Sequence, residues 1–199
     1  VIAYPIEKAD VDGNQLINWL CEFYCSSQKG EGDWGKPGEL KDFIWSCDEM
    51  NFNWLDIPAM IKSAEFIFEY PMVDRNPLAK WTKGRVTLLG DAAHPMYPRG
   101  SNGAGQAILD GVDLAKRLSS KVIHQEALEL YEHERRPKTT EVVYANRTVP
   151  PDAILKEVYD RTGDKPFDEI EDIIKRDELE LIANNYKTIA GFDRTSLET

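Results

Sequence analysis

The chain has 199 residues, of which 42% are hydrophobic and 30% charged, and its formal net charge is −11. This is the composition of a globular domain in water, and no apolar run approaches the ~20 residues that cross a bilayer. The acidic balance argues against nucleic acid as a partner, because phosphates are bound by basic surfaces.

The first 80 residues are predicted to contain a β-hairpin, a short helix and a further strand. Asp12-Gly13-Asn14 is a hairpin turn signal, and Phe66, Phe68 and Tyr70 alternate as they would on a strand. In chain order we expect a strand over 1–6, a strand over 15–23, a loop over 28–40, a short helix over 55–62 and a strand over 66–70.

Residues 81–149 are predicted to contain one strand and at least two helices. The apolar run at 85–89 is typical of a buried strand. Helical spacing begins near Gly103 and appears again over 125–136, after which Pro137 either starts a new helix or kinks the existing one. The acidic residues 150–199 carry regular apolar positions that predict helices over 152–161 and 167–185.

The most informative segment lies between the strand at 85–89 and the helix that follows. It begins Gly90-Asp91-Ala92-Ala93-His94-Pro95 and is dense in glycine and proline up to Gly105, which excludes regular structure until the helix begins. Ligands of open α/β sheets bind beyond the carboxyl ends of strands. A carboxylate at that position accepts hydrogen bonds from sugar hydroxyls, and the helix N-terminus stabilises negative charge.

This segment resembles the second flavin-binding motif of the FAD-dependent aromatic hydroxylases, the para-hydroxybenzoate hydroxylase class. Within that class the chain looks most like the C-terminal part of salicylate and phenazine hydroxylases. The similarity extends in the same order over flanking motifs, namely Asp74-Arg75-Asn76-Pro77-Leu78 with Trp81, Tyr131-Glu132, Arg135-Arg136-Pro137 and Asn146-Arg147.

The resemblance implies a role for each matching residue. Asp91 would bind the ribitol of FAD, Pro98 would line the reactive face of the flavin, and Gly90 would permit close approach of the backbone. The pyrimidine edge of the ring would be held by Gly100, Asn102, Gly103 and Ala104. No residue is assigned as catalytic.

The fold class implied is α/β (α+β), the C-terminal half of a two-domain FAD/NAD(P)-binding monooxygenase. Residues 1–80 would belong to the substrate-binding sheet domain, 81–149 to a returning segment of the FAD-binding domain, and 150–199 to a helical extension. FAD recognition in this class needs a strand, then G-x-G-x-x-G, then a helix near the N-terminus, and we expect no such motif in this chain. We therefore expect the N-terminal Rossmann βαβ unit to be absent from this chain.

The function implied is FAD- and NAD(P)H-dependent hydroxylation of an aromatic or heteroaromatic substrate through a flavin C4a-hydroperoxide. We expect the chain alone to be inactive and to expose an apolar face, which would contact the missing FAD-binding half or another copy of itself. Two alternatives remain: another flavoenzyme reaction on the same fold, such as halogenation, epoxidation or reduction, and a non-catalytic remnant or interaction module.

Cysteine and histidine add little evidence for further chemistry. Three cysteines, Cys21, Cys25 and Cys47, are typical of reduced thiols in a cytoplasmic protein. No second Cys/His pair completes a metal site, so no metal is expected. His94 is interpreted either as a brace for the loop or, less favourably, as a general base, because a base requires demonstrated geometry.

Overall fold

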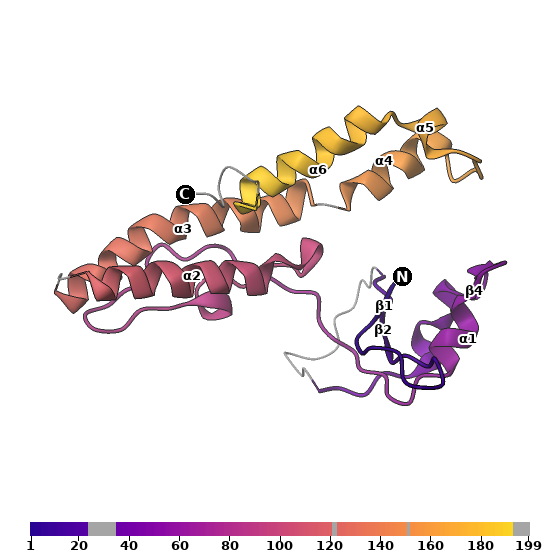
Figure 1. Ribbon diagram of the computed structural model, residues 1–199, viewed down its shortest axis with the longest axis horizontal. Helices are drawn as coiled ribbons and strands as arrows, with labels where there is room; N and C mark the ends of the chain where they lie inside the picture. Colours follow the sequence, from indigo (N-terminus) through magenta and orange to yellow (C-terminus); the bar gives the residue numbers. More distant parts are fainter. Residues whose placement is uncertain (24–34, 121–122, 151, 193–199) are drawn as a thin grey trace. The chain divides into compact units, whose positions relative to one another are not determined.

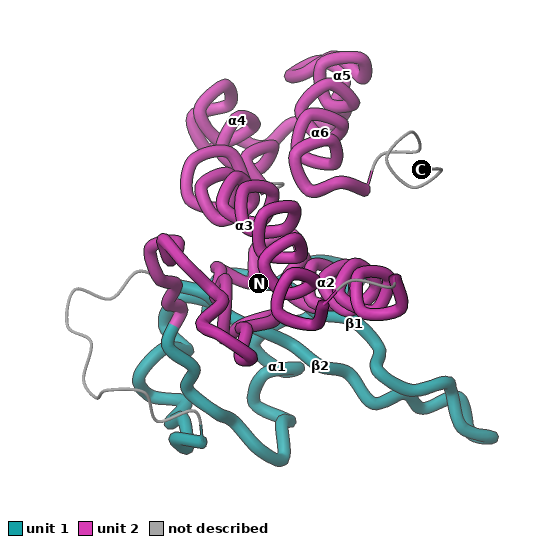
Figure 2. Tube along the Cα trace, turned by 90° about the vertical axis from the view of Figure 1, so that its left-hand side faces the viewer, with its two compact units in different colours: residues 1–71 teal, residues 72–199 magenta. Residues whose placement is uncertain are grey.

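The computed structural model describes residues 1–23, 35–120, 123–150 and 152–192. The chain divides into two compact units, Val1–Pro71 and Met72–Thr199 (Figure 2). The functional division expected at residues 80 and 149 remains a prediction.

The first unit begins with the predicted hairpin. Strands β1 (Ile2–Pro5) and β2 (Ile17–Leu20) pair antiparallel, with Ile2 opposite Leu20 and Pro5 opposite Ile17. The turn between them is held by Asp10, whose Oδ1 accepts hydrogen bonds from the backbone N–H groups of Asp12 and Asn14. Both predicted strands are confirmed, although each is shorter than expected.

After the hairpin, several short elements form around a small hydrophobic core. They are two 3₁₀ turns, η1 (Leu40–Asp42) and η2 (Ile44–Ser46), the short strands β3 (Asn51–Phe52) and β4 (Leu55–Asp56), and helix α1 (Ile57–Lys62). The carboxylate of Asp56 caps α1 by accepting from the N–H of Ala59 at 2.8 Å, as expected of an N-cap residue. The helix predicted over 55–62 is therefore confirmed from residue 57 onward.

The strand predicted over 66–70 is wrong. Phe68 forms only an isolated bridge with Pro37, and Phe66, Phe68 and Tyr70 are all exposed. Alternation of aromatic residues indicates a strand only where a neighbouring strand continues the ladder, and among the described residues none does so here. Residues 28–34 of the predicted loop lie outside the described residues.

The second unit is mainly helical (Figure 1). Helix α2 (Asn102–Ser119) packs against the long helix α3 (His124–Thr148), which also packs against α6 (Arg176–Ala190). Helices α4 (Ala153–Thr162) and α5 (Ile170–Ile173) lie between α3 and α6 in sequence. Two further 3₁₀ turns, η3 (Gly90–Ala92) and η4 (Arg99–Ser101), precede α2. The helices predicted near Gly103 and over 152–161 are confirmed.

Helix α3 continues through Pro137, so this proline does not start a new helix. A proline inside a helix removes one backbone hydrogen bond. Pro137 itself is exposed, but the helix buries Tyr131 and Arg135 before it and Thr139 and Val142 after it. We infer that packing on both sides of the proline holds the helix together.

The single helix predicted over 167–185 is instead two helices. Ile174, between α5 and α6, has an extended backbone (φ −144°, ψ 129°) and a buried side chain. The break places this side chain inward, which the apolar spacing alone did not indicate.

The strand predicted over 85–89 is also wrong. Leu89 is extended (φ −145°, ψ 147°), but the segment forms only one bridge, between Lys83 and Val86. An extended segment becomes a strand when a second strand pairs with it, and no described segment does so. The described residues thus form a mixture of helices with two small two-stranded sheets, of α+β character.

Candidate functional site

The predicted flavin loop begins at a glycine that the structure requires. Gly90 is buried and has a left-handed backbone (φ +60°), which side chains disfavour. A Cβ placed on Gly90 would lie 3.2 Å from the Cβ of Ala107 on α2. Glycine therefore allows the chain to turn sharply and to approach α2 closely.

Asp91 and the start of α2 lie together, although they are separated by eleven residues in the sequence. A Cβ placed on Gly103 would lie 3.7 Å from Oδ1 of Asp91. Asp91 is exposed, and the first N–H groups of a helix have no partner within the helix. The structure thus places an accessible carboxylate beside a helix N-terminus, both of which were predicted site features.

The loop between them carries two consecutive left-handed residues. Gly100 has φ +73° and Ser101 has φ +54°, a conformation that is strained for a residue with a side chain. Pro98 and Ala104 are exposed at either end of this turn. At Pro98, Gly100 and Ala104 the turn therefore exposes residues without large side chains.

Asn102, another predicted site residue, is engaged inside the protein. Its side chain is buried and donates from Nδ2 to the hydroxyl of Tyr186 on α6 at 2.6 Å. The Tyr186 hydroxyl in turn donates to Oδ1 of Asn146, and Nδ2 of Asn146 donates to the carbonyl of Tyr97 at 3.1 Å. The side chain of Asn102 connects the loop to α3 and α6. Only the backbone of Asn102 therefore remains available to contact a ligand.

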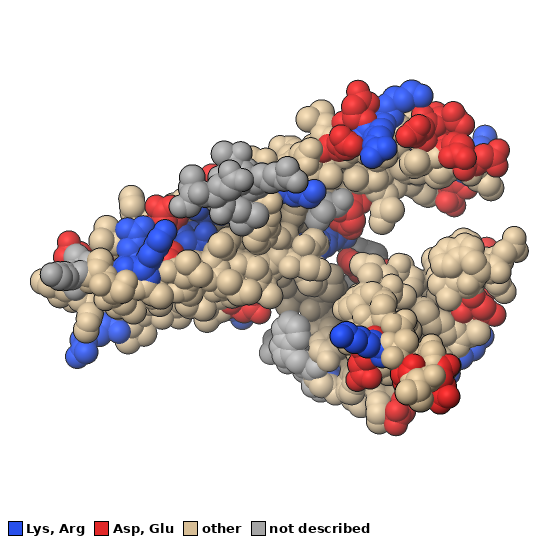
Figure 3. All heavy atoms as spheres, viewed as in Figure 1, with Lys and Arg blue, Asp and Glu red and all other residues tan. Residues whose placement is uncertain are grey.

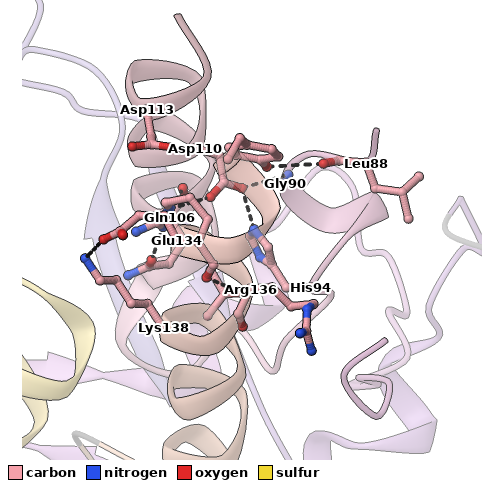
Figure 4. A network of polar contacts seen from close by, with 12 residues as sticks. Leu88, Gly90, His94, Gln106, Asp110, Asp113, Glu134, Arg136 and Lys138 are labelled. Atoms are coloured by element: carbon pink, nitrogen blue, oxygen red, sulfur yellow. Dashed lines mark hydrogen bonds and ion pairs between the residues drawn. The ribbon is translucent and has the colours of Figure 1, made fainter. Parts of the chain in front are cut away.

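A buried carboxylate, Asp110, holds the other end of the loop (Figure 4). The N–H of Gly90 donates to its Oδ2 at 3.1 Å, and Nε2 of His94 lies 2.6 Å from the same oxygen. Nε of Arg135 on α3 donates to Oδ1 at 2.7 Å. All three side chains are buried. This network was not predicted as a site, although a charged residue at an inward position of α2 is a signal that indicates one.

Gln106 extends the network to α6. Its Oε1 accepts from Arg135 at 2.7 Å, and its Nε2 donates to the backbone carbonyl of Ala190 at 2.7 Å. Asn102, Gln106 and Asp110 are spaced four residues apart and share one face of α2. The buried face of α2 therefore carries a row of polar side chains.

The network sets the charge state of its central groups. Although burial alone would raise the pKa of Asp110, hydrogen bonds from His94, Arg135 and Gly90 hold it below its ordinary value. Burial, together with the charge of Asp110, raises the pKa of Tyr131, whose hydroxyl donates to the Leu88 carbonyl at 3.1 Å. Asp110 is thus an anion and Tyr131 a neutral donor at neutral pH.

His94 is positioned as a brace. Its imidazole is 2% exposed and is bonded to Asp110, and the ring of Trp81 packs against it at 5.6 Å. A general base needs access to its substrate. The bracing interpretation therefore agrees with the structure better than the catalytic one.

The flanking motifs also converge. Nε of Arg147 near the end of α3 lies 2.5 Å from Oδ2 of Asp74, and its NH1 donates to Oδ1 of Asn76 at 2.9 Å. The N–H of Arg75 donates to the Pro95 carbonyl at 3.4 Å. The segment before the loop and the end of α3 are thereby fixed to each other.

No cluster of three metal-binding side chains occurs among the described residues. The same part of the chain contains no helix both long and apolar enough to span a membrane.

Residues 30–35 match G-x-G-x-x-G letter for letter, so the expectation that the chain lacks such a motif is wrong as regards the letters. Residues 30–34 lie outside the described residues. The segment that follows contains the bridge at Pro37 and the three-residue turn η1, whereas a dinucleotide-binding motif opens a helix. In the described residues that directly follow residue 35, no α-helix begins before α1.

Comparison with known proteins places this loop in an FAD binding domain, whose family model matches residues 67–146. The phenazine 1,6-dicarboxylic acid hydroxylase PhzS of Lysobacter antibioticus is 49% identical over 150 residues, which are 74% of this chain. A 3-hydroxybenzoate 6-hydroxylase of Polaromonas naphthalenivorans is 43% identical over 149 residues. A 6-hydroxynicotinate 3-monooxygenase of Bordetella bronchiseptica is 35% identical over 88 residues, 43% of this chain.

The matched region is a minor part of each relative. It covers 37% of the phenazine hydroxylase, 34% of the 3-hydroxybenzoate hydroxylase and 23% of the 6-hydroxynicotinate monooxygenase. The chain therefore spans well under half the length of the curated relatives that it matches.

Proposed function

Because this chain is related to FAD-dependent aromatic monooxygenases, we propose that it forms the flavin-ring side of an enzyme that hydroxylates an aromatic acid. The observation that carries the proposal is the position of Asp91 beside Gly103 at the start of α2. This arrangement lies inside the segment that matches an FAD binding domain.

The residues present fit the ribitol and ring of FAD. Asp91 offers an accessible acceptor for ribitol hydroxyls, and the N-terminus of α2 offers free N–H groups for the polar edge of the ring. Pro98 and Gly100 in the loop, and Gly103 and Ala104 in the first turn of α2, carry no large side chains. When bound and reduced by NAD(P)H, the flavin would supply oxygen activation as a hydroperoxide.

The role of the protein in such a reaction is to position and to stabilise. Asp91 would orient the ribitol, and the helix N-terminus would favour the negative charge of the reduced ring. The Asp110 network would keep Gly90 and α2 at a constant distance, because it binds both. None of these residues needs to exchange a proton with the substrate.

The substrate class is proposed from the relatives. The three relatives described above are named for phenazine 1,6-dicarboxylic acid, 3-hydroxybenzoate and 6-hydroxynicotinate. All three are aromatic or heteroaromatic carboxylic acids. We therefore expect an aromatic or heteroaromatic acid as substrate.

We propose that residues outside these 199 bind the adenosine and pyrophosphate of FAD and cover an exposed apolar face of the second unit. On α2 this face contains Ile108 and Val112, which are 67% and 54% exposed, and Leu118. Val86 and Leu89 of the extended segment are exposed as well. The part of the surface formed by α2 is mostly uncharged in Figure 3. Exposed apolar patches usually contact another surface.

A chimeric enzyme tests the function. The part of the Lysobacter hydroxylase outside the match is joined to this chain, and FAD content, NAD(P)H oxidation and hydroxylated product are measured. We expect bound FAD and hydroxylation of an aromatic acid. In the same chimera, Asp91→Ala is expected to lower FAD affinity at least tenfold, about 1.4 kcal/mol, while Asp168→Ala at an exposed position changes nothing.

The possible results separate the alternatives. Bound FAD with NAD(P)H oxidation but no hydroxylated product would favour another flavoenzyme reaction. A folded chimera that binds no FAD would favour a non-catalytic interaction module. Equal FAD affinity of the Asp91→Ala and unchanged chimeras would contradict the role given to Asp91.

A further inference from the structure

Two cysteines from distant parts of the first unit lie in contact. Cys21 directly follows β2, and Cys47 directly follows η2, and their Sγ atoms are 3.2 Å apart. The hydroxyl of Ser46 lies 3.6 Å from Sγ of Cys21 and 3.5 Å from Sγ of Cys47. Both thiols are free. The proposed flavin site makes no use of this pair.

The surroundings hold the two thiols in place. Cys47 is fully buried in the core formed with Phe43, Ile57 and Ile61, and Cys21 packs against the same core. A disulfide has an S–S distance of about 2.05 Å. The two sulfur atoms therefore need to approach by little more than 1 Å, a movement within the reach of side-chain rotation.

The two thiols differ in access to solvent. Cys21 is partly exposed, whereas Cys47 is completely buried. A small oxidant in solution therefore meets Cys21 first. The buried thiol of Cys47, already in contact, is then placed to attack the oxidised sulfur. This is the arrangement of an oxidisable cysteine with its resolving partner.

We propose that Cys21 and Cys47 form a peroxide-sensitive pair that closes into a disulfide between the end of the hairpin and η2. In the first step the Cys21 thiol reacts with hydrogen peroxide to give a sulfenic acid and one water. In the second step the sulfur of Cys47 attacks this sulfenic acid, which forms the S–S bond and releases a second water. The two thiols lose two electrons and two protons in total, and one peroxide is reduced.

The environment makes the reaction slow rather than absent. Burial raises the pKa of the Cys21 thiol, so little of it is the reactive thiolate at neutral pH. The pair accordingly behaves as a site modified under sustained oxidant and not as a fast sensor. Ser46 and the contact with Cys47 keep the pair aligned during this time.

The test uses the full chain with Cys25→Ser, which leaves one possible intramolecular bridge. The protein is treated with hydrogen peroxide, denatured, alkylated and digested. We expect the intact mass to fall by two hydrogens, both thiols to become protected from alkylation, and a single linked peptide to contain Cys21 and Cys47. Reduction before alkylation should return both thiols.

Single variants separate the two steps. With Cys47→Ser added to Cys25→Ser, Cys21 should accumulate as a sulfenic acid that a dimedone probe captures, and no internal bridge can form. With Cys21→Ser, Cys47 should stay unmodified in the folded protein. Circular dichroism of each variant checks that the fold is retained.

Three outcomes would overturn the proposal. The first is that both thiols of the Cys25→Ser chain remain alkylatable after prolonged treatment. The second is that oxidation of this chain produces only bridges between molecules. The third is that the unaltered chain links Cys21 to Cys25 instead of Cys47. None of these measurements depends on FAD, so failure here leaves the proposed function untouched.

Discussion

The carboxylate of Asp110 on α2 connects two segments, the predicted flavin loop and α3. It accepts from the backbone of Gly90 and from His94 in this loop, and from Arg135 on α3. A buried charge of this kind is tolerated only when it is paired and hydrogen-bonded. Its removal therefore affects the loop and the helix packing together.

We predict that Asp110→Asn destabilises the protein by about 3 kcal/mol or more, because the buried Arg135 loses the charge that compensates it. Urea unfolding followed by circular dichroism measures this. Asp113→Asn is the matched control, since Asp113 is one turn away and pairs with Arg117 nearer the surface; there we expect about 0–1 kcal/mol. Equal losses in the two variants would contradict the importance given to the buried network.

The pH dependence of stability provides a second test of the same residue. The pKa of Asp110 is lower in the folded protein than its ordinary value. Its contribution is therefore complete above the unfolded-state pKa of about 3.9 and is lost as the pH falls through the lower folded-state pKa. The stability difference between the unaltered protein and Asp110→Asn should be constant from neutral pH to about pH 5 and should narrow in acid. A difference that widens in acid would have the wrong sign.

Gly90 allows a prediction with a control inside the same unit. Gly90 and Gly84 have nearly the same left-handed φ, +60° and +61°, but a Cβ on Gly84 would meet nothing within 4 Å. Gly84→Ala should cost about 1–2 kcal/mol from backbone strain alone. Gly90→Ala should cost about 1 kcal/mol more, because its Cβ would press on Ala107. Thermal unfolding of both variants measures the difference, and equal losses would rule out the close contact with α2.

Among the elements, α2 has an unusual distribution of side chains. Its buried row contains Asn102, Gln106 and Asp110, whereas Ile108 and Val112 are exposed. Helices of globular proteins normally bury the apolar face and expose the polar one. The buried polar side chains find their hydrogen-bond partners within the protein, and the exposed apolar side chains remain available to contact another surface.

We predict that this exposed face makes the chain bind apolar dyes and associate with itself. The double variant Ile108→Glu with Val112→Glu should lower dye fluorescence and shift size-exclusion elution toward a monomer, while circular dichroism stays unchanged. Leu155→Glu, on α4 and 71% exposed, is the matched control and should have little effect. A monomeric unaltered chain without dye binding would argue against an apolar contact face.

The elements differ in how far the sequence predicts them, and the reason is physical. The starts of α2 and α4 and the β1–β2 hairpin depend on local spacing and turn residues, and these predictions are confirmed. The segment at 85–89 depends on a partner strand that no described residue provides, so its apolar run is not enough. The break at Ile174 depends on tertiary burial, which local periodicity does not contain.

The candidate site shows the same limit. The motif predicts that Asp91 and Gly103 belong to one site, and the structure brings them together. The side chain of Asn102 is turned inward to Tyr186, a contact across 84 residues. Spacing within a motif predicts which parts of the loop lie close together. Long-range contacts decide which side chains remain free for a ligand.

At the scale of the whole molecule, the question is how much of FAD these 199 residues bind alone. In the proposed site, Asp91 would accept from the ribitol and the N-terminus of α2 would face the ring. After the motif at 30–35, no α-helix begins in the described residues before α1. Each tenfold gain in affinity requires about 1.4 kcal/mol, so losing the pyrophosphate contacts is costly. We predict that flavin fluorescence titration gives an affinity for the chain alone at least tenfold weaker than for the chimera. Asp91→Ala should abolish the residual binding, and a tight stoichiometric yellow complex of the chain alone would contradict this division of the site.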